Sequence, residues 1–177
     1  MMIFWVILSA VVIYCFLVFI ASRFLVPFMD WGGFKPATQV PDGIKAAIAE
    51  LEARAINQRS YLEAVYDLVM QKNRSQWHHT RLRVLLNLPR AWVTELSEIW
   101  ETHDFIYCTG MNYLVAALLV DSKYFKAEDI RVRHTFVNFF IHQYLQVNVR
   151  GSSWVDVDPA GSGIRGKPLG THLEWFG

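Results

Sequence analysis

The sequence has few cysteines and no cluster of like charges. Only Cys15 and Cys108 are present, and Cys15 lies in an apolar segment, so a bridge would have to join that segment to the rest of the chain. We therefore expect no disulfide and a free Cys108. Two cysteines without a CxxC pair exclude a zinc site of the usual cysteine spacing, and we expect no cofactor. Lysine and arginine total 17 against 16 acidic residues. Without a basic stripe, the chain is not expected to bind nucleic acid.

Charged side chains are absent from the first 22 residues. Residues 1–21 are nearly continuously apolar, and the apolar character continues through Phe28 if Ser22 and Arg23 are taken as an interruption. About 20 apolar residues suffice to cross the hydrocarbon core of a bilayer. A secretory signal would carry a basic N-terminal region and a shorter apolar stretch, and a buried core helix would normally show a polar stripe. We therefore predict a retained transmembrane helix over residues 1–28, with the lipid bilayer as a partner.

The basic residues near this segment indicate an orientation. None precedes it, whereas Arg23, Lys35 and Lys45 follow it. The excess of basic residues in cytoplasmic flanks predicts that the main domain lies in the cytoplasm.

The remainder divides into a juxtamembrane linker over residues 29–43, rich in glycine and proline, and a domain over residues 44–177. Helical spacing of apolar residues predicts helices over 44–57, capped by Asp42, and over 60–72, 91–101 and 109–120, while 82–87 fits a short helix or strand. Alternation predicts strands over 130–137, 139–149 and 153–157. Helices followed by an antiparallel sheet indicate an α+β fold.

Cys108 is expected at the N-terminal end of the buried helix over 109–120. The positive end of a helix dipole favours a thiolate, and the free backbone N–H groups there can stabilise an oxyanion. The position therefore suits a nucleophile, although cysteines are also common space-filling residues in protein cores.

His142 and Asp158 are candidates for the base and its acid partner. If residue 149 closes against residue 153, Tyr144 lies opposite Asp158 and His142 lies on the diagonal of the same face. A one-residue slip would separate the two side chains. Asp156 lies on the same face and is a rival for the acid role. The other histidines are interpreted as surface or local structure, because they lack partners at metal-ligand spacing: His78, His79, His103, His134 and His172.

The chain resembles the transglutaminase-like core of the papain-like superfamily over about residues 60–160. The resemblance is carried by Cys108 with the apolar helix to Leu119, by Asp129-Ile130-Arg131-Val132, by His142 with the strand to Val147, and by Trp154 to Pro159. It implies that Cys108 is the nucleophile, His142 the general base and Asp158 the orienting acid.

Four positions depart from the family pattern. Ile106 stands where a small residue, often glycine, is usual, and Asn112 replaces the usual alanine. The strand begins His-Gln-Tyr, through Gln143 and Tyr144, instead of His-Ala-Trp.

The resemblance implies an enzyme in which Cys108 attacks an amide and passes the acyl group to water or to an amine. Hydrolysis, as in a protease or amidase, ranks before transfer, because many bacterial relatives of this fold are thought to be hydrolases. Two alternatives stay open: a catalytically silent module that binds a peptide or protein at the membrane, and a structural membrane subunit. Aromatic side chains are predicted to line a peptide groove, with Tyr144 and Trp154 as substrate-binding residues beside Trp175 and Phe176.

Overall fold

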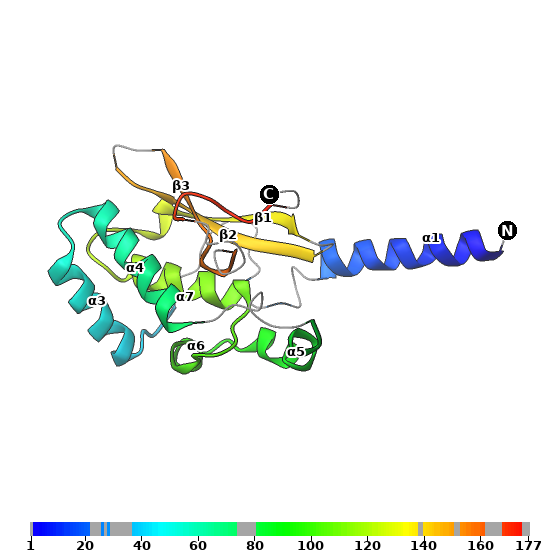
Figure 1. The fold of residues 1–177 in the computed structure, drawn as a ribbon, viewed down its shortest axis with the longest axis horizontal. Helices are drawn as coiled ribbons and strands as arrows, with labels where there is room; N and C mark the ends of the chain where they lie inside the picture. Colours follow the sequence, from blue (N-terminus) through cyan, green and yellow to red (C-terminus); the bar gives the residue numbers. More distant parts are fainter. Residues whose placement is uncertain are drawn as a thin grey trace.

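The structure is a computed structural model that describes residues 2–21, 26, 28, 37–73, 81–137, 140–150, 153–161 and 168–174. Within these residues, a set of helices packs against a three-stranded antiparallel sheet, and one helix, α1, projects from an end of the molecule (Figure 1). The predicted combination of helices and an antiparallel sheet is therefore confirmed.

The first two helices of the domain are α3, Asp42–Arg54, and α4, Gln58–Lys72. The prediction that Asp42 caps α3 is wrong, because Pro41 occupies the N-cap position and Asp42 lies in the first turn, where its charge complements the helix dipole. Helix α4 begins earlier than predicted, because the side chains of Asn57 and Ser60 form a capping box.

The helix predicted over 91–101 is instead two short elements. A 3-10 helix, η3, covers Leu88–Trp92, and α6 covers Leu96–Glu101. Pro89 lies in the first turn of η3, where its missing N–H has no cost, and Val93 and Glu95 have extended backbone that separates the two elements. The short segment before them is a helix, α5, Arg81–Leu86.

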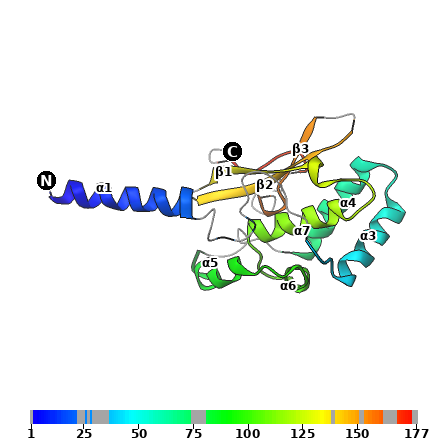
Figure 2. The same ribbon diagram turned by 180° about the vertical axis from the view of Figure 1, so that it is seen from behind.

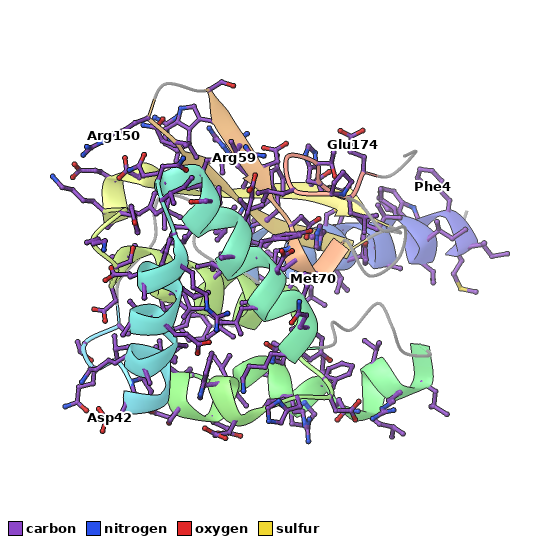
Figure 3. The ribbon with its side chains drawn as sticks, turned by 60° about the vertical axis from the view of Figure 1, so that its left-hand side comes forward. Phe4, Asp42, Arg59, Met70, Arg150 and Glu174 are labelled. Atoms are coloured by element: carbon purple, nitrogen blue, oxygen red, sulfur yellow. The ribbon has the colours of Figure 1, made fainter. Side chains whose placement is uncertain are left out.

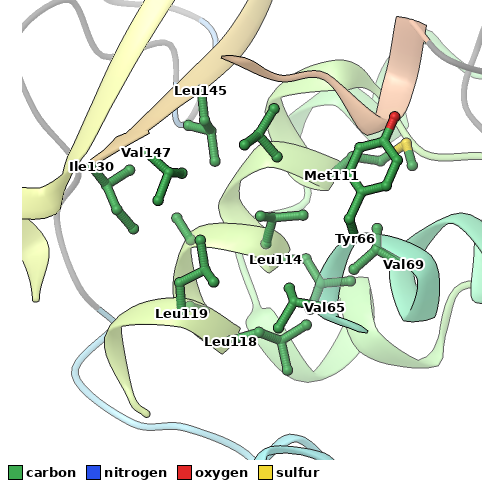
Figure 4. Packing of buried hydrophobic residues seen from close by; sticks show 14 of the residues in the cluster. Val65, Tyr66, Val69, Met111, Leu114, Leu118, Leu119, Ile130, Leu145 and Val147 are labelled. Carbon is green, nitrogen blue, oxygen red and sulfur yellow. The ribbon is translucent and has the colours of Figure 1, made fainter. Parts of the chain in front are cut away.

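Helix α7, Cys108–Val120, is the centre of the core. It packs against α4 on one side and strand β2 on the other (Figure 4). Its small and apolar side chains permit this close packing on several faces. Burial of each large apolar side chain contributes roughly 1.5–3 kcal/mol to the stability of the fold. The labelled side chains of this cluster come from α4, α7 and the sheet: Val65, Tyr66, Val69, Met111, Leu114, Leu118, Leu119, Ile130, Leu145 and Val147.

The sheet has the strand order β1-β2-β3. Strand β1 covers Ile130–Val137 and follows a short 3-10 helix, η4, Ala127–Asp129; β2 covers Phe140–Asn148 and β3 covers Trp154–Val157. Both pairs are antiparallel, and β2 pairs with β3 with Asn148 opposite Trp154. This register is the one predicted from closure of residue 149 against residue 153.

The N-terminal segment forms α1, Met2–Cys15, followed by a π-helix, η1, Phe16–Ala21. Figures 1 and 2 show α1 leaving the domain at the end away from α3, and Figure 3 shows Phe4 projecting on this helix. No helix in the described part of the chain is both long and apolar enough to cross a membrane. The predicted transmembrane helix over 1–28 is thus not found, because α1 has 14 residues.

Phe28, the last residue assigned to that helix, belongs to the domain. Its ring stacks on Tyr113 of α7 at 3.8 Å between centroids, and its carbonyl accepts a hydrogen bond from the Gln143 side chain at 2.8 Å. Most of the predicted linker over 29–43 lies outside the described residues, and its last two residues enter α3.

Candidate active site

Cys108 is the first residue of α7, as predicted for a thiol at a helix start. Tyr107 is the N-cap residue, and within the described structure its side chain makes no hydrogen bond to the first turn. The backbone N–H groups of this turn carry the positive end of the helix dipole. Cys108 is buried, with 4% of its surface exposed, so a reagent or substrate reaches the thiol only where the surrounding side chains give way.

A buried hydrogen bond joins His142 of β2 to Asp158, which follows β3. The distance between His142 Nε2 and Asp158 Oδ2 is 2.8 Å, and the side chains are 0% and 2% exposed. The predicted register brings them to one face, because Leu145 pairs with Val157 and the next pair along the strands sets Tyr144 opposite Asp158.

Backbone N–H groups hold the Asp158 carboxylate in place. The N–H of Gly161 donates to Oδ1 at 2.8 Å, and the N–H of Leu173 donates to Oδ2 at 2.9 Å. A side chain at residue 161 would collide with the carboxylate, so this turn requires glycine. The C-terminal segment thus completes the shell around Asp158, which the sequence did not indicate.

The protonation of His142 is coupled to both neighbours. Burial opposes the charged ring, but hydrogen bonds with Asp158 and with the Cys108 thiol, together with the charges of both, raise the pKa of His142 to about 10. Burial likewise opposes ionisation of Asp158, yet the hydrogen bond and charge of His142 and the two backbone N–H groups lower its pKa. Since Nε2 is engaged by Asp158, Nδ1 is the ring nitrogen that remains for Cys108.

These shifts predict how stability depends on pH. A folded-state pKa of about 10 for His142, above the unfolded value of about 6.5, stabilises the fold fully below pH 6.5. This stabilisation is lost as the pH rises from about 6.5 through 10. We expect the free energy of unfolding, measured by urea denaturation, to fall over this range. In the His142→Gln variant the fall should be reduced, and an equal slope in both proteins would contradict the assignment.

Two other predicted residues lie on the same sheet face. The Tyr144 ring stacks in parallel on His172 at 4.2 Å, beside the Asp158 region. Trp154 lies at the other end of β3, where the guanidinium of Arg131 covers its ring at 3.8 Å. Trp154 is thus separated along the strand from Asp158, and its role in substrate binding stays a prediction, as does that of Tyr144.

Asp156, the other candidate for the acid, pairs with a different histidine, His172. Its Oδ2 lies 2.7 Å from His172 Nδ1, and its Oδ1 accepts a hydrogen bond from Gln146 at 2.9 Å. The backbone N–H of Gly170 donates to the Asp156 carbonyl. His172 was interpreted as surface or local structure, and its pairing with Asp156 was not predicted. Its position 16 residues after Asp156, the same spacing as His142 to Asp158, is no independent signal of that contact.

The departure at Asn112 has a structural explanation. Its side-chain amide donates to the backbone carbonyl of Gln143 at 2.7 Å, in a buried contact. This bond ties the first turns of α7 to the residue beside His142. An alanine could not make it.

We expect Asn112→Ala to lower the free energy of unfolding by about 1–3 kcal/mol, because it removes the donor from a buried carbonyl. Urea denaturation measures this loss. Gln71→Ala, which removes an exposed amide from α4, is the matched control and should change stability by less than about 0.5 kcal/mol. Equal effects of the two substitutions would contradict a tethering role.

A small cavity of about 80 Å³ adjoins the start of α7. The residues on both sides of Cys108 line it, together with part of α6: Ile99, Thr102, Ile106, Tyr107, Thr109 and Gly110. Cys108 itself is not among the lining residues, so the cavity adjoins the start of α7 without reaching the thiol.

Within the described residues, the remaining histidines form no metal site. No three potential ligands converge in the described residues. His78 and His79 lie outside them, as do Trp175 and Phe176 of the predicted groove.

No family model matches the chain, and no curated protein matches it. The chain is similar to one crystal structure of a TGase, at 15% sequence identity and a TM-score of 0.48 over 70% of this chain. It spans 34% of that protein's length. The chemistry proposed below therefore rests on the contacts of Cys108, His142 and Asp158.

Proposed function

We propose that the protein is a cysteine hydrolase with a transglutaminase-like core that acts on amides. The observation that carries the proposal is the buried hydrogen bond between His142 and Asp158, with the thiol of Cys108 interacting with the same imidazole. A nucleophile, a base and an orienting acid in this relation form the usual arrangement for acyl transfer.

The protonated ring of His142 favours the thiolate of Cys108 by charge, because the pKa of the imidazole is raised. The thiolate attacks the amide carbonyl carbon, and the carbonyl electrons move to oxygen, where N–H groups at the start of α7 stabilise the negative charge. His142 then gives its proton to the leaving nitrogen. The carbon–nitrogen bond breaks, and a thioester at Cys108 remains.

Water or an amine resolves the thioester. Neutral His142 takes a proton from the incoming water or amine as it attacks, and the thiolate leaves with its electron pair. Asp158, held by Gly161 and Leu173, keeps the imidazole in one orientation in both steps. Water yields a carboxylic acid, and an amine yields a new amide.

Incubation of the full chain with a peptide library that carries backbone and glutamine side-chain amides tests this function. Mass spectrometry would detect cleaved or deamidated products, and added dansylcadaverine would report transfer. We expect hydrolysed products and a smaller share of amine adducts. If neither product forms and no thioester is trapped on Cys108, the silent binding module is the better account.

We also propose that the N-terminal segment inserts into a lipid bilayer. Every residue of α1 is exposed, and its side chains are almost all apolar, as at Phe4 and Trp5. An apolar helix without a polar stripe is unstable in water unless lipid or protein covers it. The cytoplasmic location of the domain stays a prediction, because Arg23 and Lys35 lie outside the described residues.

A further inference from the structure

A second exposed apolar surface lies on α5 and η3. Leu82, Leu86, Leu88 and Trp92 are 67%, 72%, 46% and 47% exposed; we call these four side chains the leucine–tryptophan face. Pro89 joins Leu88 and Trp92 around a shallow, almost wholly apolar hollow. Apart from α1 and η1, the other large apolar side chain exposed in the described residues is Ile56. Exposed apolar groups are thus concentrated on this segment.

The face lies at the membrane-proximal end of the domain if α1 enters a bilayer. Figures 1 and 2 show α5 at the end from which α1 projects, whereas the turn between α3 and α4 lies at the opposite end. Phe28 ties the N-terminal segment to α7 and β2 through its stack on Tyr113 and its bond with Gln143. The chain is therefore in contact with the domain at Phe28, seven residues after the end of η1.

The composition of the segment fits the boundary between lipid head groups and acyl chains. Exposed arginines, Arg83 and Arg90, accompany the leucines, and Arg83 also pairs with Asp104. Leucine and tryptophan next to basic side chains is the pattern of interfacial helices, which bind anionic membranes through buried apolar area and charge.

We propose that the leucine–tryptophan face rests in the surface of the anionic bilayer that takes up α1. This inference rests on the proposed insertion of α1. It adds the position of the Cys108 site relative to the membrane surface. The Tyr107 hydroxyl donates to the Val84 carbonyl at 2.8 Å, so the residue that precedes Cys108 is bonded to α5. Cys108 is thereby held on the side of the domain that carries the leucine–tryptophan face, and the substrate class this placement favours is an amide within reach of the lipid head groups.

Site-specific fluorescence on the full chain tests this placement. In a Cys15→Ser, Cys108→Ala background, Leu86→Cys carries an NBD label, and Ile56→Cys is the matched control, because Ile56 is 87% exposed and apolar but lies in the α3–α4 turn. The protein is reconstituted with vesicles of phosphatidylcholine and phosphatidylglycerol. Flotation, quenching by doxyl-labelled lipid and quenching by aqueous iodide are then measured.

We expect the chain to float, with the label at residue 86 quenched at least about two-fold more by doxyl lipid than the label at residue 56, and less by iodide. If the chain floats but both labels respond alike to iodide, the face does not contact lipid, while insertion of α1 stands. If residue 86 is shielded from both quenchers, a protein or a second copy covers the face and the inference fails. If the chain does not float, both membrane proposals fail, and the amide chemistry is tested separately.

Discussion

Replacing Cys108 with alanine is expected to abolish amide turnover, with kcat/KM falling by roughly 10³-fold or more. The thiol is the nucleophile of the proposed reaction, and alanine leaves His142 and Asp158 without an atom that can form the thioester. The measurement is product formation from the peptide library under the same conditions for both proteins.

The control for this substitution is Cys15→Ser. Cys15 ends α1 and is exposed, and it takes no part in the proposed reaction, so turnover should be unchanged. Alanine is smaller than cysteine and apolar, so the Cys108→Ala chain should still fold, which circular dichroism verifies. Residual turnover at the original level in Cys108→Ala would assign the activity to another residue or to a contaminant.

The second large effect is expected from Asp158→Asn, with kcat reduced by roughly 10²- to 10⁴-fold. The carboxylate accepts from His142, Gly161 and Leu173, and an amide in its place can no longer accept all three bonds. It also removes the negative charge that raises the pKa of His142. The variant should therefore show a pH profile whose alkaline limb moves to lower pH.

Asp156→Asn is the matched control for Asp158→Asn. It makes the same chemical change two residues earlier, where the partner is His172 instead of His142. A merely structural role for either carboxylate would lower the yield of folded protein without moving the pH profile. We expect the profile to shift only in Asp158→Asn, and an equal shift in both variants would contradict the assignment of Asp158.

The sequence predicted the parts of the site that depend on periodic patterns. A run of small and apolar residues after Cys108 located the start of α7, and the alternation in two strands, with a short connection, determined the register that brings His142 and Asp158 together. These features are local, so they can be read without the tertiary structure.

The contacts that the sequence did not reveal join segments far apart in the chain. Leu173 reaches Asp158 and His172 reaches Asp156 because the C-terminal segment folds back along β3, and no periodicity marks such a loop. Asn112 was seen as a departure from a family pattern, while its bond to Gln143 became visible only in the fold. The predicted membrane span extended to Phe28 because that residue is apolar, but its ring packs on Tyr113 of the domain. Composition alone does not distinguish a lipid-facing side chain from one that packs on protein.

Alkylation of Cys108 by iodoacetamide at pH 6 reports whether His142 activates the thiol. An ordinary thiol is about 0.3% thiolate at this pH and reacts slowly, so fast alkylation of Cys108 requires an activating neighbour. Intact-mass measurements in a Cys15→Ser background should show that His142→Ala slows alkylation by about 100-fold. Removal of the His142 ring also opens space beside the buried thiol, and this steric effect by itself would make alkylation faster. A rate that is equal or higher in His142→Ala would contradict activation of Cys108 by His142.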